Sequence, residues 1–326
     1  IGIALTAEQM KALTSDIVWM VSKTVTLADG SQQQVLVPQV YAVVKQGDLN
    51  GSGALLAGRD IDLSVSGEIN NQGRIIAGNE INITAENISN GKGGNIQGSD
   101  ISLTAQQDIN NIGGHISANE SLSLTAGRDI TISSTINKTE VRDGDNSFVQ
   151  NTIGSVGSLS VNNDGGQMSI NAGRDVNLNA AQITANGQES QIAIEAGNNV
   201  NLGVVETTTG QAVYFDSDNY TKQTVTTEVG SAILGNGDIS IKSGNDVAIK
   251  GAQISAQDTL DIQAKNDLTI EEARQHIVYE DHTKTEDHSG GGTSQTINMH
   301  TELDHNLALG SQLSGGEVNL SAGRDM

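Results

Sequence analysis

The chain has 326 residues, a net charge of −22, one proline, no cysteine, and few rings: two phenylalanines, four tyrosines and one tryptophan. The acidic balance argues against a nucleic-acid partner and predicts a soluble monomer, and the lack of cysteine excludes disulfides and thiolate metal sites. The scarcity of rings indicates a narrow interior lined by Ile, Leu, Val and Ala, and no apolar run approaches the ~18 residues of a membrane-spanning helix.

Residues 1–53 differ from the rest of the chain and are predicted to form an N-terminal cap. "TAEQ" (6–9) is a capping-box pattern that predicts a short helix. "DIVWMVSKTVTL" and "QVLVPQVYAVV" flank "ADGS" and predict a hairpin, in which Pro38 is tolerable on an edge strand. We expect the cap to cover the first repeat, because an open repeat end exposes apolar side chains and unpaired strand edges.

Residues 54–134 repeat with a period of about 20. Apolar residues two apart, as in "ISLTA" (101–105), indicate strands with one buried face, and Gly, Asn and Asp separate about three strands per unit. So short a unit cannot bury its own apolar face, which predicts a right-handed parallel β-helix with a rise of ~4.8 Å per turn. The recurring residues are Gly58, Gly78 and Gly98; Ile61, Ile81 and Ile101; Ile76, Ile96 and Ile116; and, with a slip of one, Ile69, Ile88 and Ile109.

All the rings lie outside the repeating units, as expected if the interior has no room for them. They are Trp19, Tyr41, Phe148, Tyr214, Phe215, Tyr220 and Tyr279.

The short sequence "AGRDI" or a variant of it recurs along the chain and is either a ligand motif or a repeated corner. We favour a corner, because Asn79-Glu80, Gln107-Asp108 and Asn198-Asn199 are expected to fill the same place. Stacked Arg and Asp would contribute ~0.5 kcal/mol per pair, and the Asn pairs at 70–71 and 110–111 predict amide ladders. The copies lie at 57–61, 126–130, 172–176, 196–200, 243–247 and 322–326.

Residues 135–326 combine further repeats with departures from them. "AGRDVNLNAAQITA" (172–185) matches "SGNDVAIKGAQISA" (243–256), and the pattern is interrupted near 135–156, 204–229 and 271–309. The second interruption has Thr-rich arms around "DSDN", which predicts a hairpin. Because the interruptions recur at a similar phase, we expect three hairpins that project from one side and pair into a flanking sheet.

No catalytic motif is present, and neither catalytic residues nor a cofactor are predicted. The third interruption holds five of the six histidines, and His276, His282 and His288 are spaced by six, so one strand would place them on one face. Zinc or nickel binding and a pH response are two interpretations; a solvated polar hairpin is the third and the favoured one, since nothing fixes a tetrahedral site.

The rings of the second and third interruptions are candidates for contact with a partner or a lipid interface. The alternative, which we favour, is that such rings pack the hairpins against the repeats. The candidates are Tyr214, Phe215, Tyr220 and Tyr279.

Several segments resemble the repeats of filamentous haemagglutinin-type exoproteins, among them "ALLAGRDIDL", "AENISNGKGGNIQGSDISLTA" and "GGQMSINAGRDVNLNAAQITA". The opening segment "SDIVWMVSKTVTLADGSQQQVLVPQVY", running into "GDLNGSGALLAGRDI", is more specific. It resembles the start of the second haemagglutinin-repeat region of contact-dependent growth-inhibition exoproteins of the CdiA type.

This resemblance implies export by two-partner secretion through an outer-membrane transporter, and a place on the bacterial cell surface. It also implies a module that engages the outer membrane of a target cell and assists the translocation of a toxin. The family supplies no catalytic residues, so we expect a protein that is not an enzyme. Because the chain starts without Met and stops at "SAGRDM", we expect it to be an internal part of a longer protein.

Two alternatives remain open. The first is a passive adhesin stalk, which would not associate with target outer membranes. The second is a carbohydrate-active enzyme, since β-helices host polysaccharide lyases, although the regular repeats lack the rings that such a groove needs.

Overall fold

A computed structural model of the chain describes residues 17–26, 32–41, 54–287 and 295–326, in which every regular element is a strand. The chain divides into two units, residues 1–52 and 53–326. The predicted helix at 6–9 lies outside the described residues.

The first unit contains one antiparallel hairpin, β1 (Ile17–Thr26) and β2 (Gln32–Tyr41), paired from Ile17 opposite Tyr41 to Thr26 opposite Gln32. Pro38 lies opposite Met20, and a two-stranded sheet leaves each strand a free edge where proline is tolerated. The role of this hairpin as a cover for the first repeat stays a prediction.

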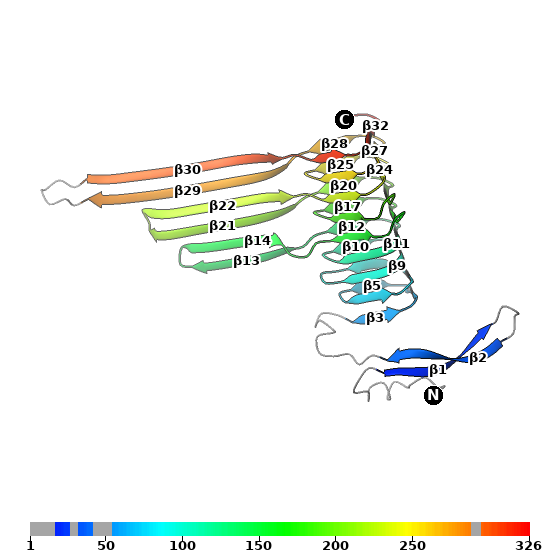
Figure 1. The fold of residues 1–326 in the computed structure, drawn as a ribbon. Coiled ribbons are helices and arrows are strands. Elements are labelled where there is room, and N and C mark those ends of the chain that lie inside the picture. The colour runs from blue at the N-terminus through cyan, green and yellow to red at the C-terminus, as the bar shows by residue number, and fades with distance from the viewer. Residues whose placement is uncertain (1–16, 27–31, 42–53, 288–294) are drawn as a thin grey trace. The chain divides into compact units, whose positions relative to one another are not determined.

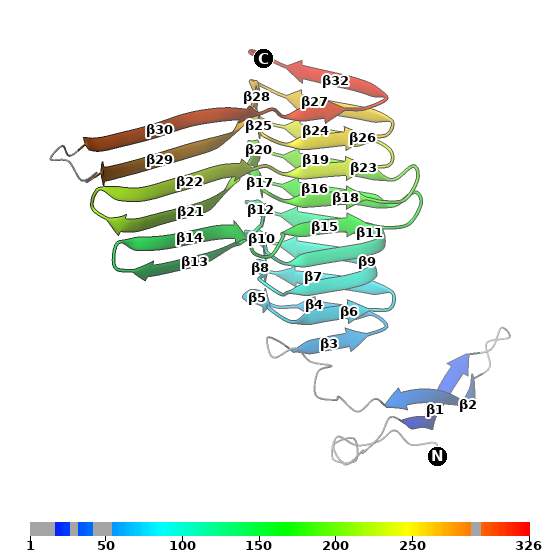
Figure 2. The same ribbon diagram turned by 60° about the vertical axis from the view of Figure 1, so that its left-hand side comes forward.

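The second unit is a parallel β-helix, as predicted, and we call it the tube (Figures 1 and 2). Each turn, or rung, has three strands, and every strand pairs in parallel with its counterpart in the next rung. Three corners follow: the first between strands one and two, the second between strands two and three, and the third leading to the next rung. In β9 and β11 the first two strands are continuous.

The strands of the tube are these. First strands are β3 (Leu55–Gly58), β6 (Arg74–Ala77), β15 (Ser158–Val161), β18 (Gln182–Ala185), β23 (Ala232–Gly235), β26 (Gln253–Ala256) and β31 (Gln312–Ser314). Second strands are β4 (Ile61–Ser64), β7 (Glu80–Ala85), β16 (Gln167–Ala172), β19 (Gln191–Ala196), β24 (Ile239–Ser243), β27 (Thr259–Ala264) and β32 (Glu317–Ala322). Third strands are β5 (Glu68–Asn71), β8 (Asn87–Asn90), β10 (Ile109–Ile112), β12 (Ile130–Ser133), β17 (Val176–Asn179), β20 (Val200–Gly203), β25 (Val247–Lys250) and β28 (Leu268–Glu271). The continuous strands are β9 (Asn95–Ala105) and β11 (His115–Ala126).

Aliphatic columns fill the interior of the tube. Ile81 stacks on Ile61 and below Ile101, as the spacing predicts, and the side chain of Ile81 is fully buried. Burying such a side chain stabilises the fold by about 1.5–3 kcal/mol, so columns of this kind are the main source of stability. No Phe, Tyr or Trp lies in the described tube strands.

The constant period of 20 is wrong in the first strand of the early rungs. Ile75, not Ile76, pairs with Ile96, and Gly58 pairs with Ala77 rather than with Gly78. The reason is a difference in corner length: two residues join β5 to β6, whereas four join β8 to β9.

Three hairpins leave the tube and pair with one another into a six-stranded antiparallel sheet, the hairpin sheet, that projects from one side (Figures 1 and 2). Its strands, in spatial order, are β13 (Ile136–Asp143), β14 (Asn146–Ile153), β21 (Val205–Asp216), β22 (Asn219–Val229), β29 (Ala273–Asp287) and β30 (Gln295–Leu309).

From β12 onward, a hairpin takes the place of the third corner in every second rung, after β12, β20 and β28. The third corner one rung before each hairpin, after β10, β17 and β25, is a tight turn with positive φ at Gly113 (65°), Ala180 (46°) and Gly251 (56°), respectively. Two rungs rise ~9.6 Å, and the two arms of a hairpin also occupy ~9.6 Å of sheet. The hairpins can therefore form one continuous sheet beside the tube without strain.

Serines fasten the hairpins to the neighbouring tight corner. Ser231 is buried, donates its hydroxyl to the Leu178 carbonyl at 3.0 Å, and accepts the Ala181 N–H at 3.0 Å. Ser134, at the base of the first hairpin, donates to the Ala180 carbonyl at 2.5 Å. These bonds satisfy polar groups at the corner and fix the direction in which each hairpin leaves the tube.

Candidate functional site: corner ladder and hairpin sheet

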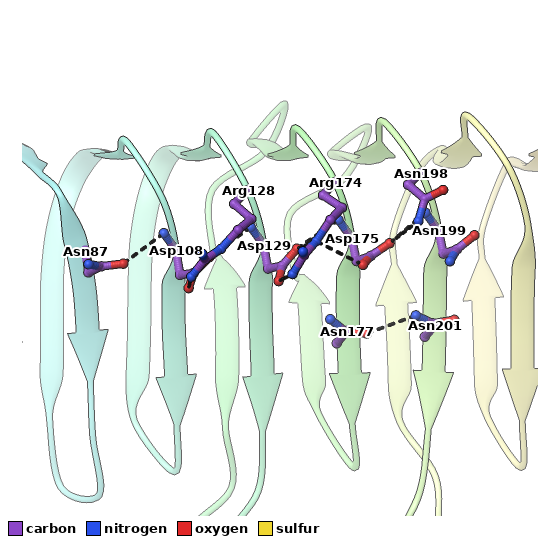
Figure 3. A network of polar contacts seen from close by, with 10 residues as sticks. All are labelled: Asn87, Asp108, Arg128, Asp129, Arg174, Asp175, Asn177, Asn198, Asn199 and Asn201. Carbon is purple, nitrogen blue, oxygen red and sulfur yellow. Dashed lines mark hydrogen bonds and ion pairs between the residues drawn. The ribbon is translucent and has the colours of Figure 1, made fainter.

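The Gly-Arg-Asp sequence forms a ladder along the second corner (Figure 3). Arg128 donates from Nε to Oδ1 of Asp108 in the rung below, at 2.7 Å, and its Nη2 pairs with Oδ2. Arg174 and Asp129 repeat this pair one rung higher. The hydrogen bond from Arg128 lowers the pKa of Asp108. The motif therefore joins rungs, as the corner interpretation predicts.

The ladder also depends on the backbone. The Asp129 N–H donates to Oδ1 of Asp108 at 3.2 Å, and the Asn199 N–H donates to Oδ1 of Asp175 at 3.1 Å. In each of these rungs the acceptor is an Asp or Asn side chain, which is short enough to place its oxygen near the backbone N–H of the next rung. The acceptors from β8 upward are Asn87, Asp108, Asp129, Asp175, Asn199, Asp246 and Asp267.

One part of the corner prediction is wrong. The copy at 57–61 lies at a first corner, between β3 and β4, whereas the copy at 126–130 lies at a second corner, between β11 and β12. Asn79-Glu80 likewise occupies a first corner and is not equivalent to Gln107-Asp108. The same five residues can thus turn the chain at two corners, which a ligand motif with one geometry would not do.

A second ladder runs inside the first three rungs. The amide of Asn71 donates to Oδ1 of Asn90, and that of Asn90 donates to Oδ1 of Asn111, both at 2.8 Å. All three side chains are buried. In the rung above Asn111 the column continues with Ile132, so the amides give way to aliphatic side chains where the hairpins begin.

The two faces of the hairpin sheet differ sharply. Val141, Phe148, Tyr279 and Leu303 belong to one row of directly paired residues and therefore share a face. We call it the apolar face. Its large apolar side chains are Val141, Phe148, Val213, Val225, Ile277, Tyr279, Ile297, Met299, Leu303, Leu307 and Leu309.

Much of the apolar face is in contact with solvent. Val141 is 58% exposed, Met299 59% and Leu303 48%, although residues of this type normally lie in a core. A shallow hollow of about 190 Å³ beside Phe148 is lined also by Thr209, Gln211 and Val225, among others. An uncovered apolar patch on a folded protein usually marks a contact surface.

The opposite face, the charged face, carries most of the ionisable side chains of the sheet. Lys222 donates to Oε2 of Glu280 at 3.0 Å, and the Tyr220 hydroxyl donates to Oε1 at 2.6 Å. The hydrogen bond with Glu280 raises the pKa of Tyr220, and the hydrogen bonds from Tyr220 and Lys222 lower the pKa of Glu280. These contacts join the second hairpin to the third.

A row of rings crosses the charged face at the same junction. The centroids of Tyr214 and Tyr220 are 5.2 Å apart, those of Tyr220 and His282 are 5.5 Å apart, and those of His282 and His300 are 5.7 Å apart. Lys222 Nζ lies 4.3 Å from the Tyr220 centroid. Tyr214 and Tyr220 thus pack within the hairpin sheet and not against the tube.

The other candidate rings lie elsewhere. Tyr279 lies on the apolar face, and Phe215, beside the irregular pairing near the tip of the second hairpin, is 82% exposed. The sequence signal that would have found the apolar face is the alternation in β30, where Ile297, Met299 and Leu303 recur at odd positions.

His276 and His282 have separate hydrogen-bond partners. His276 and His282 lie on the charged face, where His276 bonds Asp304 at 2.8 Å and His282 bonds the Asp218 carbonyl at 2.6 Å. His288 lies outside the described residues. Within the described part of the chain, no group of three or more His, Cys, Asp or Glu side chains is arranged to hold a metal ion. The same part contains no helix with the length and apolarity to cross a membrane.

Comparisons with known proteins concern the repeats. The hemagglutinin-repeat family pattern matches residues 72–163 and 212–294, together more than half of the chain, and a second haemagglutinin-repeat pattern matches residues 22–113. Toxin CdiA of Yersinia pestis is 48% identical over 64 residues, which are 19% of this chain and 2% of that protein. No solved structure gives a significant match.

Proposed function

Because the chain belongs to the haemagglutinin-repeat family, we propose that it is a surface-exposed module of a contact-dependent growth-inhibition exoprotein. In this proposal an outer-membrane two-partner secretion transporter exports the protein. The module then engages the outer membrane of a target cell, assists translocation of the toxin, and catalyses no reaction. The resemblance to Toxin CdiA supports this assignment.

The observation that carries the proposal is the exposed apolar face. The tube supplies length and stiffness, and the hairpin sheet stands to its side (Figure 2). The sheet has one apolar and one charged face. Placing Ile297, Met299 and Leu303 against lipid would remove their apolar surface from water at about 25 cal/mol per Å². The charged face would remain in water, so the sheet would lie on the membrane by one face.

The test uses the cysteine-free chain with one introduced cysteine that carries an environment-sensitive fluorophore. Leu303→Cys places the probe on the apolar face, and Glu302→Cys, the matched control, places it on the charged face of the same strand. With outer-membrane vesicles from target cells, we expect a blue shift at 303 and none at 302.

The unlabelled double variant Leu303→Lys/Leu307→Lys should bind these vesicles more weakly, while Glu302→Lys should not. A chain that does not bind outer-membrane vesicles would favour the passive adhesin stalk. Equal shifts at positions 302 and 303 would show that binding does not use the apolar face.

A further inference from the structure

The outermost strand of the hairpin sheet, β30, has one edge without a partner strand among the described residues. Its other edge pairs with β29 over the whole strand, from Leu309 opposite Ala273 to Gln295 opposite Asp287, with no shift in register. β30 contains no proline, glycine or lysine. Exposed edges are usually blunted by such residues or by bulges, and a long regular edge is a template for another strand.

The same sheet shows twice how such an edge is filled. The second arm of the first hairpin, β14, pairs antiparallel with the first arm of the next, β21, and β22 pairs in the same way with β29. β30 is also a second arm. A strand added to β30 would therefore continue an arrangement already present at two junctions.

The side-chain pattern of β30 fits such a neighbour. Odd positions such as Met299, Leu303 and Leu307 lie on the apolar face, and even positions such as Glu302 lie on the charged face. An added strand must alternate in the same phase, or it would place polar groups on the apolar face. In the first arm β29, Ile277 and Tyr279 lie on the apolar face, and charged residues such as Glu280 lie on the charged face.

We infer that the free edge of β30 is a docking site for one further antiparallel strand with the alternating pattern of a hairpin first arm. Further haemagglutinin-repeat rungs stacked on β32 would present such a strand at the matching height. The hairpin sheet is in this sense open-ended.

A second copy joined head to tail does not fit this edge. Its free first arm would be β13, which leaves the tube only after four rungs, β3 to β12. Those rungs occupy ~19 Å along the tube. They would overlap the last rungs of the first copy, where only β31 and β32 follow the third hairpin.

Backbone direction allows a sharp test. The N–H groups of Arg274 and Lys284 bond side chains of β22 residues, Glu228 and Asn219. Even positions of β29 therefore direct their N–H groups toward β22, and odd positions direct theirs toward β30. A peptide of β29 sequence that docks on the free edge of β30, in the same orientation, must use its even N–H groups.

The probe is a fluorescent peptide of residues 273–287, added to the full chain and followed by anisotropy. We expect saturable binding to the chain. N-methylation at positions 278 and 280 should weaken binding by ~10-fold or more, because backbone hydrogen bonds are lost, and methylation at 277 and 279 should not.

Loss of binding with methyl groups at 277 and 279 would overturn the proposal. If methyl groups at 278 and 280 abolish binding as well, the peptide exchanges with β29, whose N–H groups point to both β22 and β30. Binding of both methylated peptides as tightly as the unmethylated one would indicate docking on a face and would also overturn the proposal. Absence of peptide binding would also overturn the proposal. Self-association of the chain without peptide would overturn it too, because it would assign the edge to a second copy.

A variant of the chain tests the same edge. Tyr279 and Leu303 are directly paired, so the odd N–H groups of β30 point to β29 and the even ones point to the free edge. Glu302→Pro removes one free-edge donor and leaves the ladder to β29 intact. It should abolish peptide binding with an unchanged circular dichroism spectrum, while Glu302→Ala should bind as the wild type does.

Discussion

Arg174 donates from Nε to Oδ1 of Asp129 at 2.7 Å, although the two residues are 45 positions apart and the first hairpin lies between them. The chain leaves the tube at Ile136, returns after Ile153, and resumes the corner ladder one rung higher in unbroken register. The hairpins are therefore insertions at the third corner that leave the stacking at the second corner unchanged.

This pair yields a first prediction. Asp129→Ala removes the acceptor of Arg174 and of the Asp175 N–H, and should lower the free energy of unfolding by about 1–2 kcal/mol. Asp129→Asn keeps an oxygen at the same place, as Asn199 does two rungs higher. It should therefore lower the free energy of unfolding by less than Asp129→Ala does. Urea denaturation followed by circular dichroism measures both. Equal losses would show that the acceptor oxygen does not matter.

A second prediction concerns acid. Hydrogen bonds from Arg128 and Arg324 lower the pKa values of Asp108 and Asp267 in the folded chain below the ordinary value of 3.8. Folding thus favours their charged form, so their contribution to stability is present above about pH 4 and is lost as pH falls through the folded pKa values.

The double variant Asp108→Asn/Asp267→Asn keeps the acceptors but cannot titrate. Compared with the wild type, it should lose less stability as the pH falls from about 5 to about 2, as measured by urea midpoints at each pH. An identical pH dependence in both proteins would refute this role.

A third prediction concerns the buried amides. Asn90→Leu leaves the amide of Asn71 without its acceptor on residue 90 and the oxygen of Asn111 without its donor. This change should lower the free energy of unfolding by about 2–4 kcal/mol. Replacing all three asparagines by leucine should recover much of this loss, because the column would then resemble the rungs above, which have Ile132 there. Thermal unfolding of the single and triple variants measures both changes in stability. A triple variant that loses as much stability as the three single variants together would contradict the ladder.

A fourth prediction concerns the bases of the hairpins. A Cβ on Gly230 would lie 1.9 Å from the Gly251 carbonyl oxygen, whereas a Cβ on Gly310, before the equivalent serine of the third hairpin, would meet nothing within 4 Å. Gly230→Ala should therefore destabilise the chain by about 3 kcal/mol or prevent folding, and Gly310→Ala should be nearly neutral. Proteolysis and thermal unfolding report both effects. A tolerated Gly230→Ala would contradict the close packing at this corner.

Sequence periodicity was sufficient for the tube but not for its register. The spacing of Ile61, Ile81 and Ile101 correctly predicts their stack, because those strands are joined by loops of matching total length. Ile76 is misplaced by one, since corner lengths differ between rungs. Identical pentapeptides at 57–61 and 126–130 turn different corners, because the neighbouring columns, not the corner residues, decide where a corner falls.

The hairpin sheet was predictable as a feature, but its faces were not assigned. Pairing between Thr-rich arms such as β21 and β22 can slip by two residues without changing the pattern of either face, so sequence alone does not fix the register. His282 and Tyr220, two of the candidate site residues, lie on the charged face, where their ring contact joins the second hairpin to the third. The exposed aliphatic side chains of β30 define the other face and carry the proposed contact.

The equal heights of two rungs and one hairpin also constrain how such a protein can change its length. Removing a single rung between two hairpins would displace the later hairpin by ~4.8 Å, which is half the width of a hairpin, and would break its pairing with the hairpin before it. In the part of the tube that carries hairpins, growth or shortening must therefore proceed in whole steps of one rung pair with its hairpin.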